Sequence, residues 1–444
     1  MQTKELDINR LTDALMMAAE RALLPWAHLP DGKKWCVALS GGADSTALLH
    51  LLKQLADKQN AALCAVIVNH NLRPEAKAEA EAVQQAARLH QIDTDILTIT
   101  EPAPSSAVQE WARQVRYDAL CRYARQKGCL LLCAHHLDDQ NETIAMRLSH
   151  GSSVRGLSGM AETSYRQAVP IIRPFLQFPK SQLYDYCQIK GLFFIEDPSN
   201  QKTHFERVRW RQMLYGDEAL RQNIHKLGML AERLQSCLDE QLAPYFKTLV
   251  IHEGLWAEMA FDQFDALAEE AKQPILRALL ALIGGRDYIP SLAAQRQAVS
   301  QINAGKTTTL GHVIIKNTGS MLQFLPEAGR PKAREPIKAG TDMIFEGRFL
   351  VRTAQEGFIS RLNDDIWGAL DKAHPVRKQL NHAPAAVRRT FPVLHALDEE
   401  VMTTHIKGMT QIGHFTPMGW PSEGVDIYPL GRLARGVDHE FGLA

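Results

Sequence analysis

Six consecutive residues, Ser40-Gly41-Gly42-Ala43-Asp44-Ser45, combine two glycines with a carboxylate and two hydroxyl groups. They follow the apolar run 35–39 and precede the apolar run 46–52, which predicts a strand, a tight turn and then a helix. A strand that turns through glycines into a helix N-terminus presents several backbone N–H groups in one direction, and the helix dipole adds about half a positive charge there. The six residues therefore predict a phosphate-binding loop.

Asp44 is unusual in such a loop, because a carboxylate repels a phosphate. A divalent cation such as Mg²⁺ that bridges Asp44 to the phosphates removes this conflict. The loop has neither the spacer and lysine of a Walker A motif nor the G-x-G-x-x-G of a dinucleotide-binding fold. A plain strand-to-helix turn with a serine cap is the structural alternative, but the full six-residue pattern favours a phosphate site.

A second group of candidate residues lies in the segment 135–143, which reads His-His-Leu-Asp-Asp-Gln-Asn-Glu-Thr. Asp138 is a good N-cap candidate for a helix over 138–149. Asp139 and Glu142 are three residues apart, so they share one helix face. Two carboxylates there can bind a metal ion or an ammonium group such as that of lysine, and they can accept its protons. An acid-rich first turn stabilised by the helix dipole is the structural alternative.

Two histidines precede these acids. His135 stands at the end of a predicted strand, where an imidazole can contact a phosphate or orient a neighbour. A purely structural role is about as plausible for His135. We expect His136 to be structural.

Strand-like and helix-like segments alternate between residues 30 and 150, which predicts an α/β fold with a doubly wound parallel sheet and helices on both faces. The predicted strands span 34–39, 61–68, 94–99 and 129–134, and the predicted helices span 45–58, 75–91, 105–127 and 138–149. Both candidate groups, together with the segment 69–73, follow predicted strands. Ligands bind beyond the carboxyl ends of the strands in such sheets, so these groups are expected to share one site.

The length of 444 residues exceeds one ordinary hydrophobic core, so we expect more than one domain. The expected domains are an α/β catalytic domain over 1–217, a mainly helical middle domain with hairpin strands over 218–326, and a small mixed α+β domain over 327–444. Finer expectations are an N-terminal helix over 1–26, loops over 150–200, helices over 203–242 and most of 223–300, hairpin strands over 305–326, and a linker over 326–338.

The composition limits the partners and the location of the chain. Lysine plus arginine and aspartate plus glutamate both total 50, so a nucleic-acid partner would have to meet local basic patches. The seven cysteines form no C-x-x-C pair, which indicates reduced, mostly buried thiols, and no metal role is expected for Cys129 and Cys133. No segment has the roughly 20 apolar residues of a membrane span. We therefore expect a cytoplasmic protein without a membrane partner.

The loop 40–45 resembles the pyrophosphate loop (PP-loop) of the N-type ATP pyrophosphatases, which cleave ATP between the α and β phosphates and adenylate a substrate oxygen. The segment 135–143 is similar to the second motif of the tRNA(Ile)-lysidine synthases within that superfamily. Shorter segments resemble the same family in the same order: 67–74, 110–117, 150–160, 173–174 and 195–200. The sequence departs from the family at Asn71, His150 and Ser153, and in the arginine-rich segment 205–211, where an asparagine is missing between the arginines.

The resemblance implies a ligase that uses ATP to join L-lysine to C2 of the wobble cytidine in an isoleucine tRNA with a CAU anticodon. The C2 carbonyl of cytosine is a poor electrophile, so AMP attached to its oxygen supplies the leaving group that the lysine ε-amine displaces. The resemblance implies an ATP site at Ser40, Gly41, Gly42, Ala43, Asp44 and Ser45, and a Mg²⁺ site at Asp44 and Asp139. The catalytic set it implies is Asp44, His135, Asp139, Glu142, Arg113, Arg116 and Arg207.

Within this set, Asp139 and Glu142 are expected to hold the lysine ammonium and then deprotonate it. Arg113 or Arg116 is expected to steady a phosphate or the base, while one of the two can equally form a surface ion pair. Arg207 has the least defined role, because the segment around it departs from the family pattern.

Three stretches rich in arginine and lysine, 143–184, 202–211 and 372–397, are candidate tRNA contacts, although each alone is often just a solvated face. Trp210 and Tyr165 can stack on splayed bases, although Trp210 is more typical of a packed residue.

Two other functions stay open. One is a tRNA thiolase of the same superfamily, against which the missing C-x-x-C pair counts. The other is a non-catalytic RNA-binding protein on this fold. The sequence also leaves open whether the protein forms a homodimer.

Overall fold

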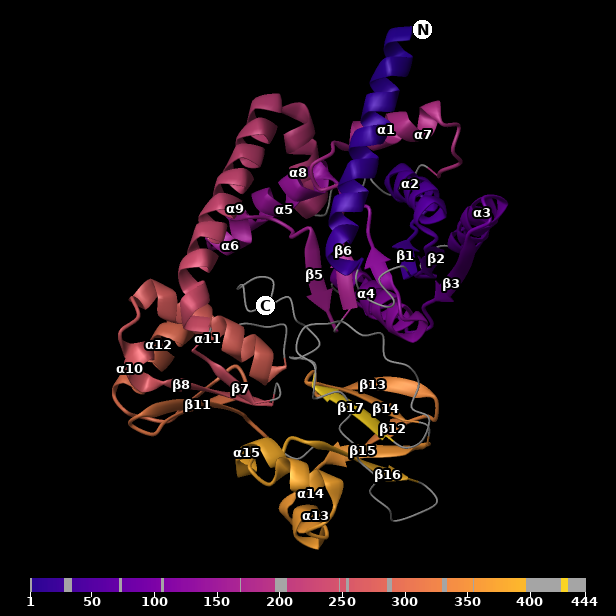
Figure 1. Ribbon diagram of the computed structural model, residues 1–444. Helices are drawn as coiled ribbons and strands as arrows, with labels where there is room; N and C mark the ends of the chain where they lie inside the picture. The colour runs from indigo at the N-terminus through magenta and orange to yellow at the C-terminus, as the bar shows by residue number, and fades with distance from the viewer. Residues whose placement is uncertain are drawn as a thin grey trace. The chain divides into compact units, whose positions relative to one another are not determined.

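The structure is a computed structural model, shown in Figure 1. It describes residues 2–27, 34–71, 74–104, 108–167, 169–195, 206–246, 248–252, 255–285, 290–329, 334–353, 355–396 and 425–429. These residues divide into two compact units, one up to Leu238 and one from Asp239 onward. The division lies within the helix α9 (Glu218–Phe246), whereas the domain boundaries expected near residues 217 and 326 stay a prediction.

The first unit is built on a six-stranded sheet with the order β3-β2-β1-β4-β6-β5. Its strands are β1 (Lys34–Ala38), β2 (Ala62–Asn69), β3 (Asp93–Thr98), β4 (Leu130–Leu132), β5 (Thr163–Arg166) and β6 (Val169–Ile172). All neighbours are parallel except β5, which is antiparallel to β6. The chain adds β2 and β3 on one side of β1, and then β4 and β6 on the other. Doubly wound sheets open a ligand crevice at such a reversal, beyond the strand ends.

Helices cover both faces of this sheet (Figure 1). They are α1 (Gln2–Leu23), η1 (Leu24–Trp26), α2 (Ala43–Gln59), α3 (Ala76–Leu89), α4 (Val108–Lys127), α5 (Leu137–Ser149), α6 (Val154–Leu157), α7 (Lys180–Ile189) and α8 (Glu206–Gly216). Right-handed crossovers put α2 and α3 on one face and α4 on the other. The α4 face has a core that includes Cys36, Val66 and Leu131. Because β1 is covered on both faces, its residues after the exposed Lys34 are apolar without alternation.

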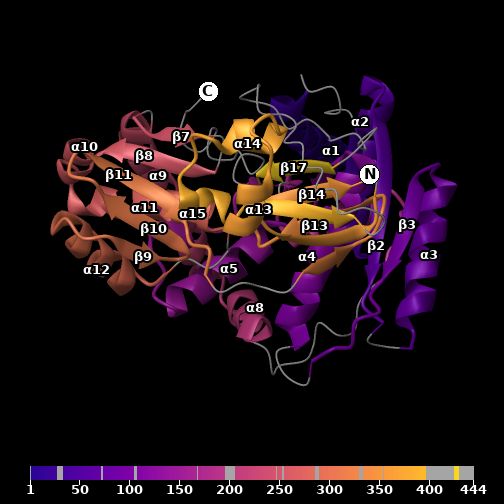
Figure 2. The same ribbon diagram turned by 90° about the horizontal axis from the view of Figure 1, so that it is seen from below.

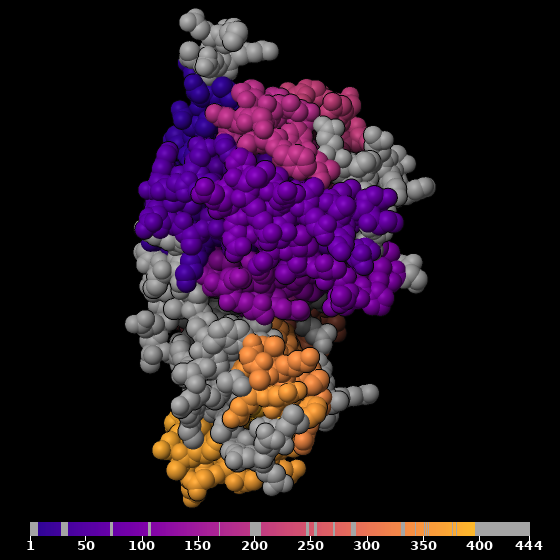
Figure 3. All heavy atoms as spheres, turned by 90° about the vertical axis from the view of Figure 1, so that its right-hand side faces the viewer, coloured from indigo at the N-terminus to yellow at the C-terminus, as the bar shows by residue number. Residues whose placement is uncertain are grey.

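The sequence predictions for the first unit are confirmed in fold class and in the four strands and helices between residues 34 and 149. The expectation of loops over 150–200 is wrong, because this stretch contains β5, β6, α6 and α7. Strand β6 was missed because it has only four residues and includes a proline. Figure 3 faces the β3 edge of the sheet, where the side chains of residues in the first 130 form a continuous surface.

The second unit begins with an antiparallel five-stranded sheet of order β7-β8-β11-β10-β9. Its strands are β7 (Val250–His252), β8 (Trp256–Ala260), β9 (Thr308–Leu310), β10 (Val313–Asn317) and β11 (Met321–Pro326), and its helices are α10 (Phe261–Asp265), α11 (Glu269–Gly284) and α12 (Leu292–Asn303). Helices α11 and α12 pack against the sheet (Figure 2). The predicted hairpin strands over 305–326 are confirmed, whereas the mainly helical interpretation of 223–300 missed β7 and β8.

The rest of the second unit is mixed α+β, as predicted. Its two three-stranded sheets have the orders β12-β15-β16 and β13-β14-β17. The strands are β12 (Glu335–Ile337), β13 (Thr341–Phe345), β14 (Phe349–Thr353), β15 (Gly357–Arg361), β16 (Pro392–Ala396) and β17 (Val425–Pro429), and the helices are α13 (Asp364–Ala369), α14 (Pro375–Leu380) and α15 (Ala385–Arg388). Leu255 and Leu325 share a core with Phe349 and Phe391, so the two parts of this unit pack together. Of the helices described in the chain, none combines the length and apolarity that a membrane crossing requires.

Candidate active site

A cavity of about 810 Å³ opens at the carboxyl ends of β1, β2 and β4 in the first unit. Ten of the twelve residues singled out from the sequence line it: Ser40, Gly42, Ala43, Asp44, Ser45, Arg113, Arg116, His135, Asp139 and Arg207. Gly41 and Glu142 lie behind this lining. The reversal of strand order thus brings together the two groups of residues that the sequence separates by about 90 positions.

The glycine loop is shaped by backbone geometry that only these residue types allow. Gly41 has φ +86°, and a Cβ there would lie 2.6 Å from Cγ2 of Val83. Gly42 is the N-cap of α2. The buried hydroxyl of Ser45 donates to the Gly42 carbonyl at 3.1 Å and accepts from the Ser40 N–H at 3.1 Å. The first N–H groups of α2 have no intrahelical partners, so they are available to an anion in the cavity.

Asp44 is the acid of this loop. Its Oδ1 is buried and has no hydrogen-bond partner among the described residues. Burial raises the pKa of Asp44, although the electrostatic effects of His136 and Lys180 oppose the shift. Hard divalent cations bind carboxylate oxygens. The buried Asp44 oxygen that has no described partner could therefore coordinate Mg²⁺, so the residues present fit this ion.

His136 links Asp44 to the acids of α5. Its Nε2 lies 3.6 Å from Oδ2 of Asp44 and 3.4 Å from Oδ2 of Asp139. The Asp139 N–H donates to His136 Nδ1 at 3.4 Å, which leaves the ring hydrogen on Nε2, between the two carboxylates. In return the His136 N–H donates to Asp139 Oδ2 at 3.3 Å, which completes a capping box. Asp44 and Asp139 therefore face the same imidazole.

The expected N-cap at Asp138 is wrong, because His136 fills that position. Asp138 lies two residues further along the chain, within the first turn of α5, and its side chain instead accepts the Lys180 N–H at 2.8 Å, at the start of α7. His136 was expected to be structural, and it does cap α5. Its place between two carboxylates of the cavity was not expected.

Glu142 is 2% exposed and has two arginine partners from α8. Its Oε2 accepts from Arg207 Nε at 2.7 Å, and its Oε1 accepts from Arg211 Nε at 2.5 Å. Nη2 of Arg207 also donates to Asp139 Oδ1 at 3.0 Å. One guanidinium group thus joins the two carboxylates of α5, and the ion pairs tie α5 to α8, which pack side by side (Figure 1).

His135 lines the cavity next to Tyr117 of α4. Burial, together with the positive charges of Arg173 and Arg116, lowers the pKa of His135 to about 3. Its Nε2 is 3.5 Å from the Tyr117 hydroxyl, and its buried Nδ1 has no hydrogen-bond partner in the described part of the chain. The imidazole is therefore neutral near pH 7, so it can bind a ligand through hydrogen bonds but adds no charge.

Both arginines that the sequence left as alternatives line the cavity. The guanidinium carbons of Arg113 and Arg116 lie 5.3 and 6.0 Å from the ring centroid of Tyr117, whose side chain is buried. The electron-rich ring face partly offsets the repulsion between the two cations. The pair supplies positive charge on the side of the cavity formed by α4.

Comparison with known proteins identifies the family of the chain. Residues 15–218 match the PP-loop domain family. The tRNA(Ile)-lysidine synthase of Ruegeria pomeroyi is 30% identical over 71% of this chain and 76% of its own length. That of Methylobacterium nodulans is 40% identical over 66% of this chain and 90% of its own length. The chain belongs to the tRNA(Ile)-lysidine synthase family. The solved structure of the U34-tRNA thiolase NcsA from Methanococcus maripaludis has 18% identity and a TM-score of 0.43, over 51% of this chain and 79% of that chain.

Further residues line this cavity from α7, α8 and the end of β2, and of these only Tyr184 has no part in the sequence predictions. Lys180 and Tyr184 line the cavity from α7, Arg211 lines it from α8, and Asn69 and His70 line it from the end of β2. Asn69 and His70 belong to the segment 69–73, which was expected at this site, whereas Lys180 and Arg211 were expected only as candidate tRNA contacts. Parts of the matched motifs lie outside the described residues: 72–73, 196–200 and 205.

A second cavity, of about 670 Å³, adjoins the first and shares His136, Lys180, Tyr184 and Arg211 with it. Its lining combines acids and bases from α5, α7, α8 and α9, including Asp138, Glu142, Asp185, Glu218 and Arg221. Oδ1 of Asn141 is buried in this region without a described partner. The second cavity therefore offers both signs of charge to a small molecule.

The basic residues proposed as tRNA contacts include some with internal partners. Arg147 donates to the carbonyls of Gly156 and Gly159 at 2.9 and 2.5 Å, and Arg173 is buried. Trp210 packs against the cluster of α5, α8 and α9, as its packed alternative predicted, and Tyr165 packs 6.2 Å from Trp26 between ring centroids. The stacking role for these two aromatic residues stays a prediction.

Proposed function

We propose that the chain is an ATP-dependent ligase that attaches L-lysine to C2 of the wobble cytidine in an isoleucine tRNA with a CAU anticodon. AMP and pyrophosphate are the other products. Membership of the tRNA(Ile)-lysidine synthase family supports these substrates. The observation that carries the proposal is that Asp44 and Asp139, from two strand ends, face the same imidazole in one cavity. A tRNA substrate also supports a cytoplasmic location.

In the first step the cytosine O2 attacks the α-phosphorus of ATP, and the bond to pyrophosphate breaks. The N–H groups of the loop and of the start of α2 hold the triphosphate. Arg113 and Arg116 add positive charge to the same cavity and stabilise the charge that develops on the phosphate oxygens. Asp44 and Asp139 hold Mg²⁺, which when bound offsets the negative charge of the departing pyrophosphate.

In the second step the lysine ε-amine attacks C2, and the bond between C2 and O2 breaks as AMP leaves with that oxygen. The ammonium must lose a proton before it attacks. Asp139 lines the cavity, so we assign it to hold the ammonium and accept the proton. Glu142 has both oxygens paired with guanidinium groups. We therefore assign Glu142 to act together with Asp139 as a positioning residue, through Arg207.

The second cavity supports a route for lysine to the reaction centre. A free amino acid carries both a carboxylate and ammonium groups, and this cavity places Asp138 and Asp185 near Arg221. It adjoins the first cavity at His136 and Lys180, next to Asp139. We propose that lysine binds here before its ε-amine reaches the adenylated cytidine.

The decisive experiment incubates the protein with ATP, labelled lysine and total tRNA. We expect label in tRNA with a CAU anticodon, together with one AMP and one pyrophosphate for each lysine joined. Product that depends on a sulfur donor would support the thiolase instead. Binding of tRNA without product in either assay would support the non-catalytic alternative.

The role of Asp139 is tested by Asp139→Asn. We expect lysine transfer to fall by about 10²–10⁴-fold, which is the usual contribution of a general base, and ATP affinity to fall less, because Asp44 can still hold Mg²⁺. Asp57→Asn is the matched control, because Asp57 is an exposed acid that pairs with Lys53 outside this cavity. Loss of ATP affinity with lysine transfer preserved would contradict the assignment.

A further inference from the structure

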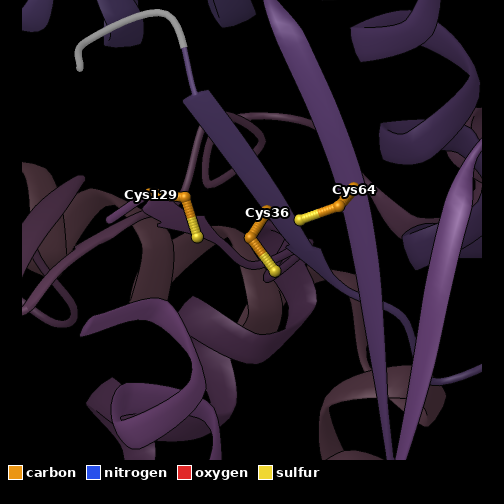
Figure 4. Close-up of side chains that lie close together, drawn as sticks. All are labelled: Cys36, Cys64 and Cys129. Carbon is orange, nitrogen blue, oxygen red and sulfur yellow. The ribbon is translucent and has the colours of Figure 1, made fainter. Parts of the chain in front are cut away.

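Three cysteine side chains from neighbouring strands of the first unit meet at one point (Figure 4). Cys36 lies on β1, Cys64 lies on β2, and Cys129 lies directly before β4. Their Sγ atoms all lie within 4.8 Å of one another. Cys36 and Cys64 are register partners in the parallel sheet, so both side chains point to the face that α4 covers.

Two of the three cysteines are buried, and the third is partly exposed. Cys36 is completely buried and Cys129 is 3% exposed, whereas Cys64 is only partly buried. Cys64 is therefore the member of the cluster at which we expect an ion to enter.

The surroundings of the cluster include the cation Lys127, while burial raises the pKa of the Cys36 thiol. The Lys127 ammonium lies 5.5 Å from the ring centroid of Tyr123, whose hydroxyl donates to Asp95 at 2.8 Å. A metal ion that binds here displaces the protons of the thiols, so binding should become tighter as pH rises.

We propose that Cys36, Cys64 and Cys129 form a three-coordinate site for a soft monovalent ion of the Cu(I) type. A metal–sulfur bond of about 2.3 Å puts three sulfur atoms of a planar trigonal site about 4 Å apart. That spacing is close to the observed cluster, so small side-chain rotations complete it. Binding releases thiol protons and transfers no electrons.

The geometry disfavours the other ions that thiolates select. Structural zinc sites use four protein ligands, and the described residues supply no fourth histidine, cysteine or carboxylate to this group. Iron–sulfur clusters usually take four thiolates, and their iron and sulfide atoms need more room than three sulfur atoms within 4.8 Å leave. Soft Cu(I) suits a small set of thiolates alone.

The cluster is distinct from the ATP site. Cys36 precedes Ser40 by four residues along an extended strand, a separation of about 13 Å at about 3.3 Å per residue. Helix α4 spans both places, since Tyr123 lies beside the thiols while Arg113 and Arg116 line the cavity. An ion in this site crosslinks β1, β2 and the start of β4, so we expect it to stabilise the first unit.

The test uses the full chain with Cys237→Ser, because Cys237 is an exposed thiol that would bind metal nonspecifically. The protein is titrated without oxygen with Cu(I) supplied as its bicinchoninate complex. We expect one ion per chain to be withdrawn from the chelator, and X-ray absorption of the product to show three sulfur neighbours. No withdrawal, or a coordination shell other than three sulfur atoms, would overturn the proposal without relying on any further variant.

Cys64→Ser in the same background is expected to lower the Cu(I) affinity by about 100-fold or more, because it removes one of three ligands. Cys121→Ser is the matched control, since Cys121 is a buried thiol of the same core outside the cluster. One equivalent of Cu(I) should raise the melting temperature of the parent and of Cys121→Ser, but not of Cys64→Ser. Equal Cu(I) affinity in all three proteins would contradict the assignment.

Discussion

Two arginine-rich segments, 206–211 in the first unit and 377–389 in the second, use arginine in different ways. In the first unit Arg207 and Arg211 converge on Glu142, which is 2% exposed. In the second unit Arg389 pairs with Asp364, whose side chain is 65% exposed. Both segments look like basic patches in the sequence. They differ in the burial of the acid that pairs with the arginines. A buried acid with two arginines fixes the packing of two helices, whereas an exposed pair is a weak surface contact.

The remaining arginines of the C-terminal segment show the same contrast. Arg377 and Arg388 lie 5.5 and 4.7 Å from the Trp367 ring centroid. Arg388 also donates to the Ala383 carbonyl at 2.7 Å. These side chains hold short helices together through a ring face and a backbone carbonyl, and no buried acid organises them. The number and sign of the charged residues in a segment therefore do not show whether the segment forms a binding site or only supports its own helices.

The largest effect in this comparison is expected for Glu142→Gln. The substitution removes the charge from the buried acid and leaves two guanidinium groups without their partner, which typically costs about 3–5 kcal/mol. We expect urea denaturation to show this loss in the first unit, and lysine transfer to fall because Arg207 no longer holds Asp139. A variant with unchanged stability would mean that the arginines pair elsewhere and that the buried cluster is not structural.

Glu218→Gln is the control for this measurement. Glu218 also pairs with an arginine and lines the second cavity, but its side chain is 61% exposed. Exposed ion pairs contribute about 0–1 kcal/mol, so the stability of this variant should stay close to that of the parent. A loss as large as that of Glu142→Gln would remove burial as the deciding factor.

The contrast also explains what the sequence could and could not predict. The loop 40–45 and the acids Asp139 and Glu142 were found because their chemistry is local, in a turn and in one helical turn. The arginine partners of Glu142 come from α8, more than 60 residues further along the chain, so they depend on how α5 and α8 pack. The cluster of Cys36, Cys64 and Cys129 depends on strand register in the same way. Contacts that depend on tertiary packing leave no local pattern in the amino-acid sequence from which they could be predicted.

A smaller effect is expected at Asp44, a buried acid without an arginine partner. Burial raises its pKa, so the folded protein binds its proton more tightly than the unfolded chain does. Stability should therefore fall as pH rises through the range that begins at the ordinary aspartate pKa of about 3.9. Metal-free Asp44→Asn should lose this dependence, so thermal melts should show it more stable than the parent at pH 7 and equal to it below pH about 3.

The same variant should reverse this order when ligand is present. Mg²⁺ with ATP should stabilise the parent, because the cation binds the Asp44 carboxylate. The same ligands should stabilise Asp44→Asn much less. Equal stabilisation of both proteins would show that Asp44 does not take part in binding. Melts of the parent that are flat between pH 4 and 7 would show that the buried oxygen already has a partner.

The smallest effect is expected in the C-terminal segment. Its exposed pair contributes little to folding, so Asp364→Asn should leave the urea midpoint unchanged within error. The substitution frees the Arg389 guanidinium, so tRNA binding should become slightly tighter if this segment contacts phosphates, and more so at low salt. Charge reversal with Arg389→Glu should weaken tRNA binding and leave ATP binding unchanged. If neither variant changes tRNA affinity at any salt concentration, this segment is a scaffold for its own helices, and tRNA recognition must depend on other basic residues.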